Sequence, residues 1–192
     1  MASERDVLLK AAPLRTLRAY MDEHLKPEAR DKVLRKAATE FPSETAHLGE
    51  RPPLVTERVP VLLVNRLVEL TAEELHEPAT VIAHRVGRRS AEEASRGILR
   101  LAMILISMPS LLRKLTPTWS QMYTHGTMSS HSEGRSATIE LTGFPVKSVV
   151  GCARVTGTFE WFAGQAEKSA TVTHSVCQAK NGGDVCKWEV HW

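Results

Sequence analysis

The feature that most constrains the fold is a set of metal-ligand residues confined to the C-terminal quarter of the chain. All three cysteines, Cys152, Cys177 and Cys186, lie there, and His174 precedes the second of them by three positions. Structural zinc takes four Cys or His ligands in a tetrahedron, with Zn–S distances of about 2.3 Å. The spacing therefore predicts a closed zinc site of these four residues, which would fix a helix to a C-terminal hairpin.

Other interpretations of these residues stay open. His191 could take the place of His174 as the fourth ligand. Without a metal, the cysteines would be buried core residues, or two of them would form a disulfide. A metal site also needs an irregular strand, because residues 174 and 177 point to opposite faces of a regular one. We therefore expect a bulge near Ser175 or Val176.

The composition is typical of a globular, mildly basic protein. A chain of 192 residues with 42% hydrophobic residues can bury a single core, and the net charge of +3 comes from interleaved acidic and basic residues. We therefore expect no nucleic-acid partner. No apolar run is long enough to cross a membrane, and the first residues lack the apolar core of a signal peptide. A cytoplasmic location is expected, where reduced thiols are available as ligands.

Hydrophobic periodicity predicts helices over the first half of the chain. Two amphipathic helices are expected between Pro13 and Glu40. Two more are expected over Val59 to Leu70 and Ala72 to Arg96, with Thr71 opening the second through a capping box. The segment from Ile98 to Ile106 is apolar on nearly every side, which predicts a central helix.

The pattern changes to strands after Pro117. Alternating residues predict a hairpin of strands 119–132 and 135–141, and a second hairpin of strands 168–179 and 185–192 follows a helix over 149–166. The chain is therefore expected to be α+β, with a helical layer packed on a short antiparallel sheet. We divide it into a helical N-terminal lead-in, residues 1–54, and a ligand-binding domain, residues 55–192.

The last hairpin contains the string Cys-x3-Asn-Gly-Gly-Asp-x-Cys-x-Trp-x-Val-x-Trp. Over residues 55–192, and most specifically over 151–192, the chain resembles the vinyl-4-reductase-type small-molecule-binding domain, within a myxobacterial-type group of bacterial proteins. The wider superfamily includes heme-NO-binding sensors and TRAPP subunits, which implies a TRAPP/heme-NO-binding-like fold around an apolar pocket. In sensors of aromatic compounds with this domain, zinc is held by positions that match Cys152, His174, Cys177 and Cys186, with an acidic residue where His174 stands here.

The resemblance also implies a ligand and a mode of action. Seven residues are expected to line the pocket, and each of them could equally be an ordinary residue of the hydrophobic core. They are Leu101, Met103, Leu105, Met108, Trp119, Tyr123 and Phe159. We expect a homodimeric, zinc-stabilised regulatory sensor that binds an apolar small molecule, lipid or acyl chain. The alternative is a TRAPP-like protein–protein interaction scaffold without an exchangeable ligand. The chain contains no catalytic motif of the Gly-x-Ser-x-Gly or His-Glu-x-x-His kind, so we expect no enzymatic activity.

Heme is the other cofactor that the superfamily suggests. The related nitric oxide sensors hold the porphyrin carboxylates with a Tyr-x-Ser-x-Arg triplet, which is missing here. His76 and His84 remain as candidate iron ligands on predicted helices. The sequence therefore argues for zinc and against heme.

Overall fold

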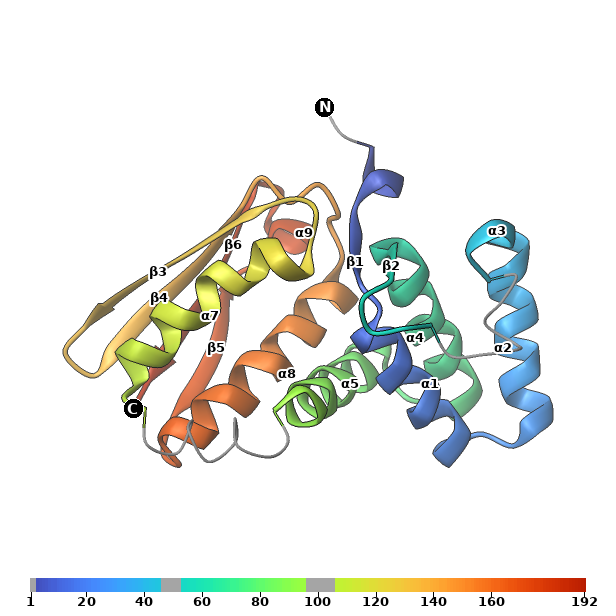
Figure 1. Cartoon of the computed structure of the whole chain (residues 1–192), viewed down its shortest axis with the longest axis horizontal. Coiled ribbons are helices and arrows are strands. Elements are labelled where there is room, and N and C mark those ends of the chain that lie inside the picture. Colours follow the sequence, from blue (N-terminus) through green and yellow to red (C-terminus); the bar gives the residue numbers. More distant parts are fainter. Residues whose placement is uncertain (1–2, 46–52, 96–105) are drawn as a thin grey trace.

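The computed structural model describes residues 3–45, 53–95 and 106–192. It confirms the expected α+β class, with helices packed on an antiparallel sheet (Figure 1). The N-terminal half consists of η1 (Glu4–Asp6), β1 (Leu8–Lys10), α1 (Ala12–His24), α2 (Pro27–Glu40), α3 (Pro42–Thr45), β2 (Arg58–Pro60), α4 (Val61–Leu75) and α5 (Ala79–Ala94). The C-terminal half consists of α7 (Met108–Met122), β3 (Thr127–Glu133), β4 (Ser136–Thr142), α8 (Val149–Ala166), β5 (Thr171–Val176), α9 (Gln178–Asn181) and β6 (Val185–His191).

The main sheet has the strand order β3-β4-β6-β5, and every pair is antiparallel. Its central strands β4 and β6 alternate between buried and more exposed residues, as expected when one face of a sheet meets a core. Trp188 of β6 is fully buried, and its indole N–H donates to Thr156 of α8 at 2.8 Å. This contact joins α8 to the centre of the sheet.

Two glycines set the contact between α5 and α8. A Cβ atom added at Gly87 would lie 2.0 Å from the carbonyl oxygen of Arg154, and one added at Gly157 would lie 2.2 Å from that of His84. Both contacts are with backbone atoms, which no side-chain rotation can move. The two helices therefore pack backbone to backbone, and this fixes α8 against the helical half.

The N-terminal segment joins the rest of the fold through a small sheet. β1 pairs with β2, Leu9 forms an isolated bridge with Tyr123, and the Leu8 N–H donates to Thr124 Oγ1 at 2.9 Å. Strands of three residues carry too little alternation to be recognised in the sequence, so we did not predict this sheet. The division of the chain at residue 54 stays a prediction.

Two predicted element boundaries were wrong. α4 continues through Thr71, whose hydroxyl is buried and donates to the Leu67 carbonyl at 2.7 Å, so this residue does not cap a new helix. The break comes later, at His76 with a φ of 55°, and Pro78 precedes α5. α7 likewise contains Pro117 and runs on to Met122, so the strand expected from residue 119 begins at Thr127.

The helix expected over Ile98 to Ile106 falls, apart from Ile106 itself, outside the described residues. Among the helices that are described, none combines the length and the apolar character needed to cross a lipid bilayer.

The start of α8 provides a test of local stability. Ser148 is the N-cap residue, and its Oγ accepts a hydrogen bond from the Gly151 N–H at 3.1 Å. A Ser148→Ala variant leaves that N–H without its partner, and we expect a loss of about 1 kcal/mol in the free energy of unfolding, measured by urea denaturation. Ser169→Ala, at an exposed hydroxyl, is the control and should stay within about 0.5 kcal/mol of the parent.

Candidate functional site

The structure brings the four predicted metal ligands together from three elements. Cys152 lies in the first turn of α8, His174 in β5, Cys177 directly after β5, and Cys186 in β6. The Sγ atom of Cys152 is 3.6 Å from that of Cys186 and 3.9 Å from that of Cys177. The ligand atoms of Cys152, His174 and Cys177 all lie within 4.8 Å of one another. We call these four residues the thiol–histidine cluster.

The expected strand irregularity is present. The pairing of β5 with β6 shifts in register between His174 and Val176. The shift lets His174 and Cys177 reach the same side of the hairpin, which a regular strand would prevent. The predicted bulge is confirmed.

The distances from Cys152 to the other two thiols suit a tetrahedral metal ion. Thiolates bound at about 2.3 Å in a tetrahedron would stand about 3.8 Å apart, close to the 3.6 and 3.9 Å found for Cys152 with Cys186 and with Cys177. The compact group of ligand atoms within 4.8 Å of one another comprises Cys152, His174 and Cys177, and Cys186 joins it through Cys152. The cysteines are buried and free, and these distances are far longer than the bond of about 2.05 Å in a disulfide. His174 stacks on Trp188 with a centroid separation of 4.6 Å, and its Nε2 is buried without a partner in the described part of the chain.

The backbone around Cys177 supports the cluster. The N–H of Gln178 donates to the Sγ of Cys186 at 3.5 Å, and the N–H of Cys177 donates to Asn181 Oδ1 at 3.0 Å. Gly182, with a φ of 68°, ends the short helix α9 and turns the chain toward β6. Hydrogen bonds of this kind, made to or beside the ligand residues, orient the ligands before a metal binds.

The thiols differ in acidity. The hydrogen bond from Cys152, assisted by those from His174 and the Gln178 N–H, lowers the pKa of Cys186 to about 5 although burial opposes the shift. The same bond to Cys186, together with burial, raises the pKa of Cys152. The contacts between the two thiols therefore favour the thiolate form at Cys186 over Cys152, and the thiolate is the form in which cysteine binds metals.

His191, the alternative fourth ligand, does not join the cluster. It lies five positions beyond Cys186 at the end of β6, is exposed, and has Glu189 as its charged neighbour at 4.0 Å.

The predicted pocket residues separate into three groups. Leu101, Met103 and Leu105 lie outside the described residues. Trp119 and Tyr123 stack at 3.9 Å and line a cavity together. Met108 is buried at the start of α7, and Phe159 packs edge-on against Trp188; neither residue lines that cavity.

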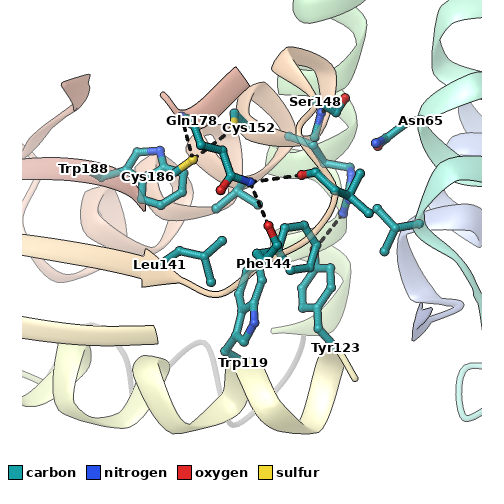
Figure 2. A pocket seen from close by; sticks show the side chains of 15 residues that line it. Asn65, Trp119, Tyr123, Leu141, Phe144, Ser148, Cys152, Gln178, Cys186 and Trp188 are labelled. Atoms are coloured by element: carbon teal, nitrogen blue, oxygen red, sulfur yellow. Dashed lines mark hydrogen bonds between the residues drawn. The ribbon is translucent and has the colours of Figure 1, made fainter. Parts of the chain in front are cut away.

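The cavity is a small space of about 20 Å³ between α4, α7, α8 and the sheet (Figure 2). Its walls also include three buried polar residues that we did not predict, Asn65, Arg154 and Gln178. Arg154 does interrupt an otherwise apolar helical stretch between Ala153 and Val155, which is the only signal that the sequence offers for them.

Comparison with solved structures gives similar folds over nearly the whole chain. An H-NOX protein from S. oneidensis in the Fe(II)NO ligation state matches with a TM-score of 0.70 and 12% identity, over 95% of this chain and 98% of that one. An Fe(II) unliganded H-NOX protein from K. algicida matches with a TM-score of 0.63 and 12% identity, over 95% and 96%. A structure concerned with heme redox potential and porphyrin distortion matches with a TM-score of 0.63 and 13% identity, over 96% and 100%. No family model and no curated protein matches the sequence.

These neighbours correct several predictions. They are H-NOX domains, so the resemblance to the vinyl-4-reductase-type and TRAPP-like domains was wrong. The predicted function and cofactor conflict with these neighbours, which are heme proteins, one of them in an Fe(II)NO state. This applies to the zinc-stabilised sensor of apolar ligands, to the TRAPP-like scaffold that was its alternative, and to zinc as the cofactor in place of heme. The physical reason is that a fold follows from a burial pattern spread over the whole chain, whereas we argued from short motifs.

Heme must therefore be tested against the residues of this chain. The cavity between the helices and the sheet has about the volume of one water molecule, whereas pockets for drug-sized ligands hold about 300–1,000 Å³. His84 Nε2 is hydrogen-bonded to Glu160 Oε2 at 2.8 Å, and His76 follows the last residue of α4 at the surface. Neither histidine lines this cavity.

The cavity between the helices and the sheet, as the described residues form it, is therefore too small for a heme, and His84 lines instead the groove of about 450 Å³ beside α5 and α8. What the similarity establishes is the architecture: this chain has the fold of H-NOX domains.

Proposed function

We propose that this chain is a non-catalytic sensor-type domain on the H-NOX fold, and that Cys152, His174, Cys177 and Cys186 form a site for one thiophilic metal ion. The observation that supports this most directly is the cluster itself, with S–S distances of 3.6 and 3.9 Å and a buried imidazole nitrogen that has no partner among the described residues. Three sulfurs and one nitrogen form a donor set that thiophilic metals prefer.

The position of the cluster suggests how metal occupancy becomes a signal. The ligands come from α8 and from both strands of the last hairpin, so a bound ion would join them. Metal-binding free energy then adds to folding free energy, and loss of the ion would loosen the hairpin against α8. Four protein ligands leave no coordination position for a substrate, which is why we propose sensing and not catalysis.

The cluster is accessible from one side. A groove of about 450 Å³ runs between α5 and α8 and is lined by Cys152, His174 and Cys177. Val81 and Val149 at the same groove are each 37% exposed. This opening would give metal ions, chelators and thiol reagents a route to the ligands.

Cobalt(II) substitution tests the proposal. Titration of reduced, metal-stripped protein is expected to saturate at about one ion per chain, with the intense visible bands of tetrahedral thiolate coordination. His174→Ala should weaken binding by about 10-fold or more, whereas His191→Ala, which changes an exposed histidine of the same hairpin, should bind as the parent does. Failure to bind cobalt, or a stoichiometric Soret band in the purified protein, would overturn the proposal.

We also propose that the chain functions as a homodimer in a reducing, cytoplasmic compartment. Free cysteines at all three positions suit such a compartment. Light scattering of the purified protein should give a mass twice the 21.3 kDa of one chain, and a mass of one chain at micromolar concentration would exclude the dimer.

A further inference from the structure

We propose that the small cavity beside α8 binds one compact monovalent anion, of halide size, at the guanidinium of Arg154. Cys152 and Cys186 of the thiol–histidine cluster also line this cavity, so the two sites are neighbours, but the proposal requires no bound metal. It rests on a buried guanidinium that has no carboxylate partner among the described residues, on a second unpaired polar group, and on the size of the space.

Arg154 is a buried cation that has no acidic partner within residues 3–45, 53–95 and 106–192. It is 4% exposed, its Nη1 donates to the Tyr123 hydroxyl at 3.1 Å, and its Nε is buried with no hydrogen-bond partner in these same ranges. No ion pair joins Arg154 to any carboxylate of the described residues. Burying an unpaired guanidinium is costly, and neutral partners such as a tyrosine hydroxyl do not cancel its charge. An anion in the adjoining cavity would cancel the charge of the guanidinium.

Asn65 supplies a second donor on another wall. It lies on α4, is 4% exposed, and neither atom of its amide has a partner in the described part of the chain. Figure 2 shows Asn65 and Gln178 on different sides of the cavity. The amide packs against Gly151, where an added Cβ would lie 3.4 Å from Nδ2.

The start of α8 adds to the positive potential. Ser148 and Gly151, in the cap and first turn of this 18-residue helix, also line the cavity. The N-terminal end of a helix dipole favours anions. Arginine, asparagine amide and helix terminus therefore all favour the same sign of charge.

The size of the cavity selects the kind of anion. A volume of about 20 Å³ holds one water-sized particle, so phosphate or a larger carboxylate is excluded from this arrangement. Gln178 is held at the cavity wall, because its Nε2 donates to the carbonyl oxygens of Phe144 at 3.2 Å and Val146 at 3.1 Å. The aromatic rings of Trp119 and Tyr123 and the thiols of Cys152 and Cys186 also line the cavity.

The experiment is thermal unfolding of the full chain at constant ionic strength, with chloride or bromide replacing gluconate. We expect the Tm of the parent to rise by about 3 °C or more and to saturate as halide approaches about 0.3 M. Arg154→Met and, separately, Asn65→Leu should each abolish the halide dependence. Arg58→Met, at an exposed arginine, should keep it.

Anomalous diffraction from crystals of the parent protein grown in bromide tests the site without any variant, so the result does not depend on whether a variant folds. One anomalous peak beside Arg154 Nε is the expected result. An unchanged Tm in halide, a halide dependence that survives in Arg154→Met, or a cavity that contains only water would each overturn the proposal. The metal content of the same samples tests the thiol–histidine cluster separately, so either proposal can fail alone.

Discussion

Gly157→Ala is expected to destabilise the protein by about 3 kcal/mol or more, which is a large fraction of the stability of a typical domain. The new methyl group would lie 2.2 Å from the His84 carbonyl oxygen. Because that atom belongs to the backbone of α5, only separation of the two helices relieves the clash. Gly87→Ala, 2.0 Å from the Arg154 carbonyl oxygen, should have an effect of similar size.

Gly164 supplies the matched control in the same helix. A Cβ atom at this position meets nothing within 4 Å, so Gly164→Ala should stabilise the protein by about 0.5–1 kcal/mol through helix propensity alone. Urea denaturation of the three variants checks the comparison. Equal stabilities for Gly157→Ala and Gly164→Ala would show that α5 and α8 do not pack backbone to backbone.

Cys186→Ser is expected to remove the bound metal and to lower the free energy of unfolding of the metal-loaded protein by about 3 kcal/mol or more. Cys186 is fully buried in β6 and contacts Cys152 and the Gln178 N–H, so serine would also place a hydroxyl where a thiolate is favoured. Hydrogen exchange should increase in β5 and β6 more than in α4, because without the metal ion the hairpin would lose its coordination link to α8.

The control for this variant is His191→Ala, which alters an exposed residue of the same strand and should change neither metal content nor hairpin exchange. The metal-stripped parent should resemble Cys186→Ser in stability. If Cys186→Ser retains one metal ion per chain with unchanged stability, Cys186 is not a ligand.

Local signals in the sequence predicted several C-terminal elements, although α9 was missed and the strand expected over 168–179 is limited to Thr171–Val176. The helix expected over residues 149–166 matches α8, and Gly182 and Gly183 marked the turn of the last hairpin because glycine tolerates positive φ. The cysteine and histidine spacing, together with the expected bulge, predicted which side chains would meet. These features depend on residues close together in the chain.

Features that depend on distant partners were missed. β1 forms because β2 and Tyr123 lie beside it, and the contact of Gly87 and Gly157 with opposing backbone appears only when α5 meets α8. The role of Arg154 as a cavity wall likewise depends on α4 and α7. The heme-NO-binding-like fold that the resemblance implied is confirmed by the H-NOX neighbours, whereas the narrower family was wrong, because at 12% identity what is shared is the arrangement of buried positions and not a motif.

The most direct test of the metal centre is elemental analysis of the purified, reduced protein combined with X-ray absorption at the edge of the metal that is found. We expect about one metal ion per chain, coordinated by three sulfurs at about 2.3 Å and one nitrogen at about 2.0 Å. Absence of stoichiometric metal, or iron in a porphyrin environment, would contradict the assignment of Cys152, His174, Cys177 and Cys186 as the metal site.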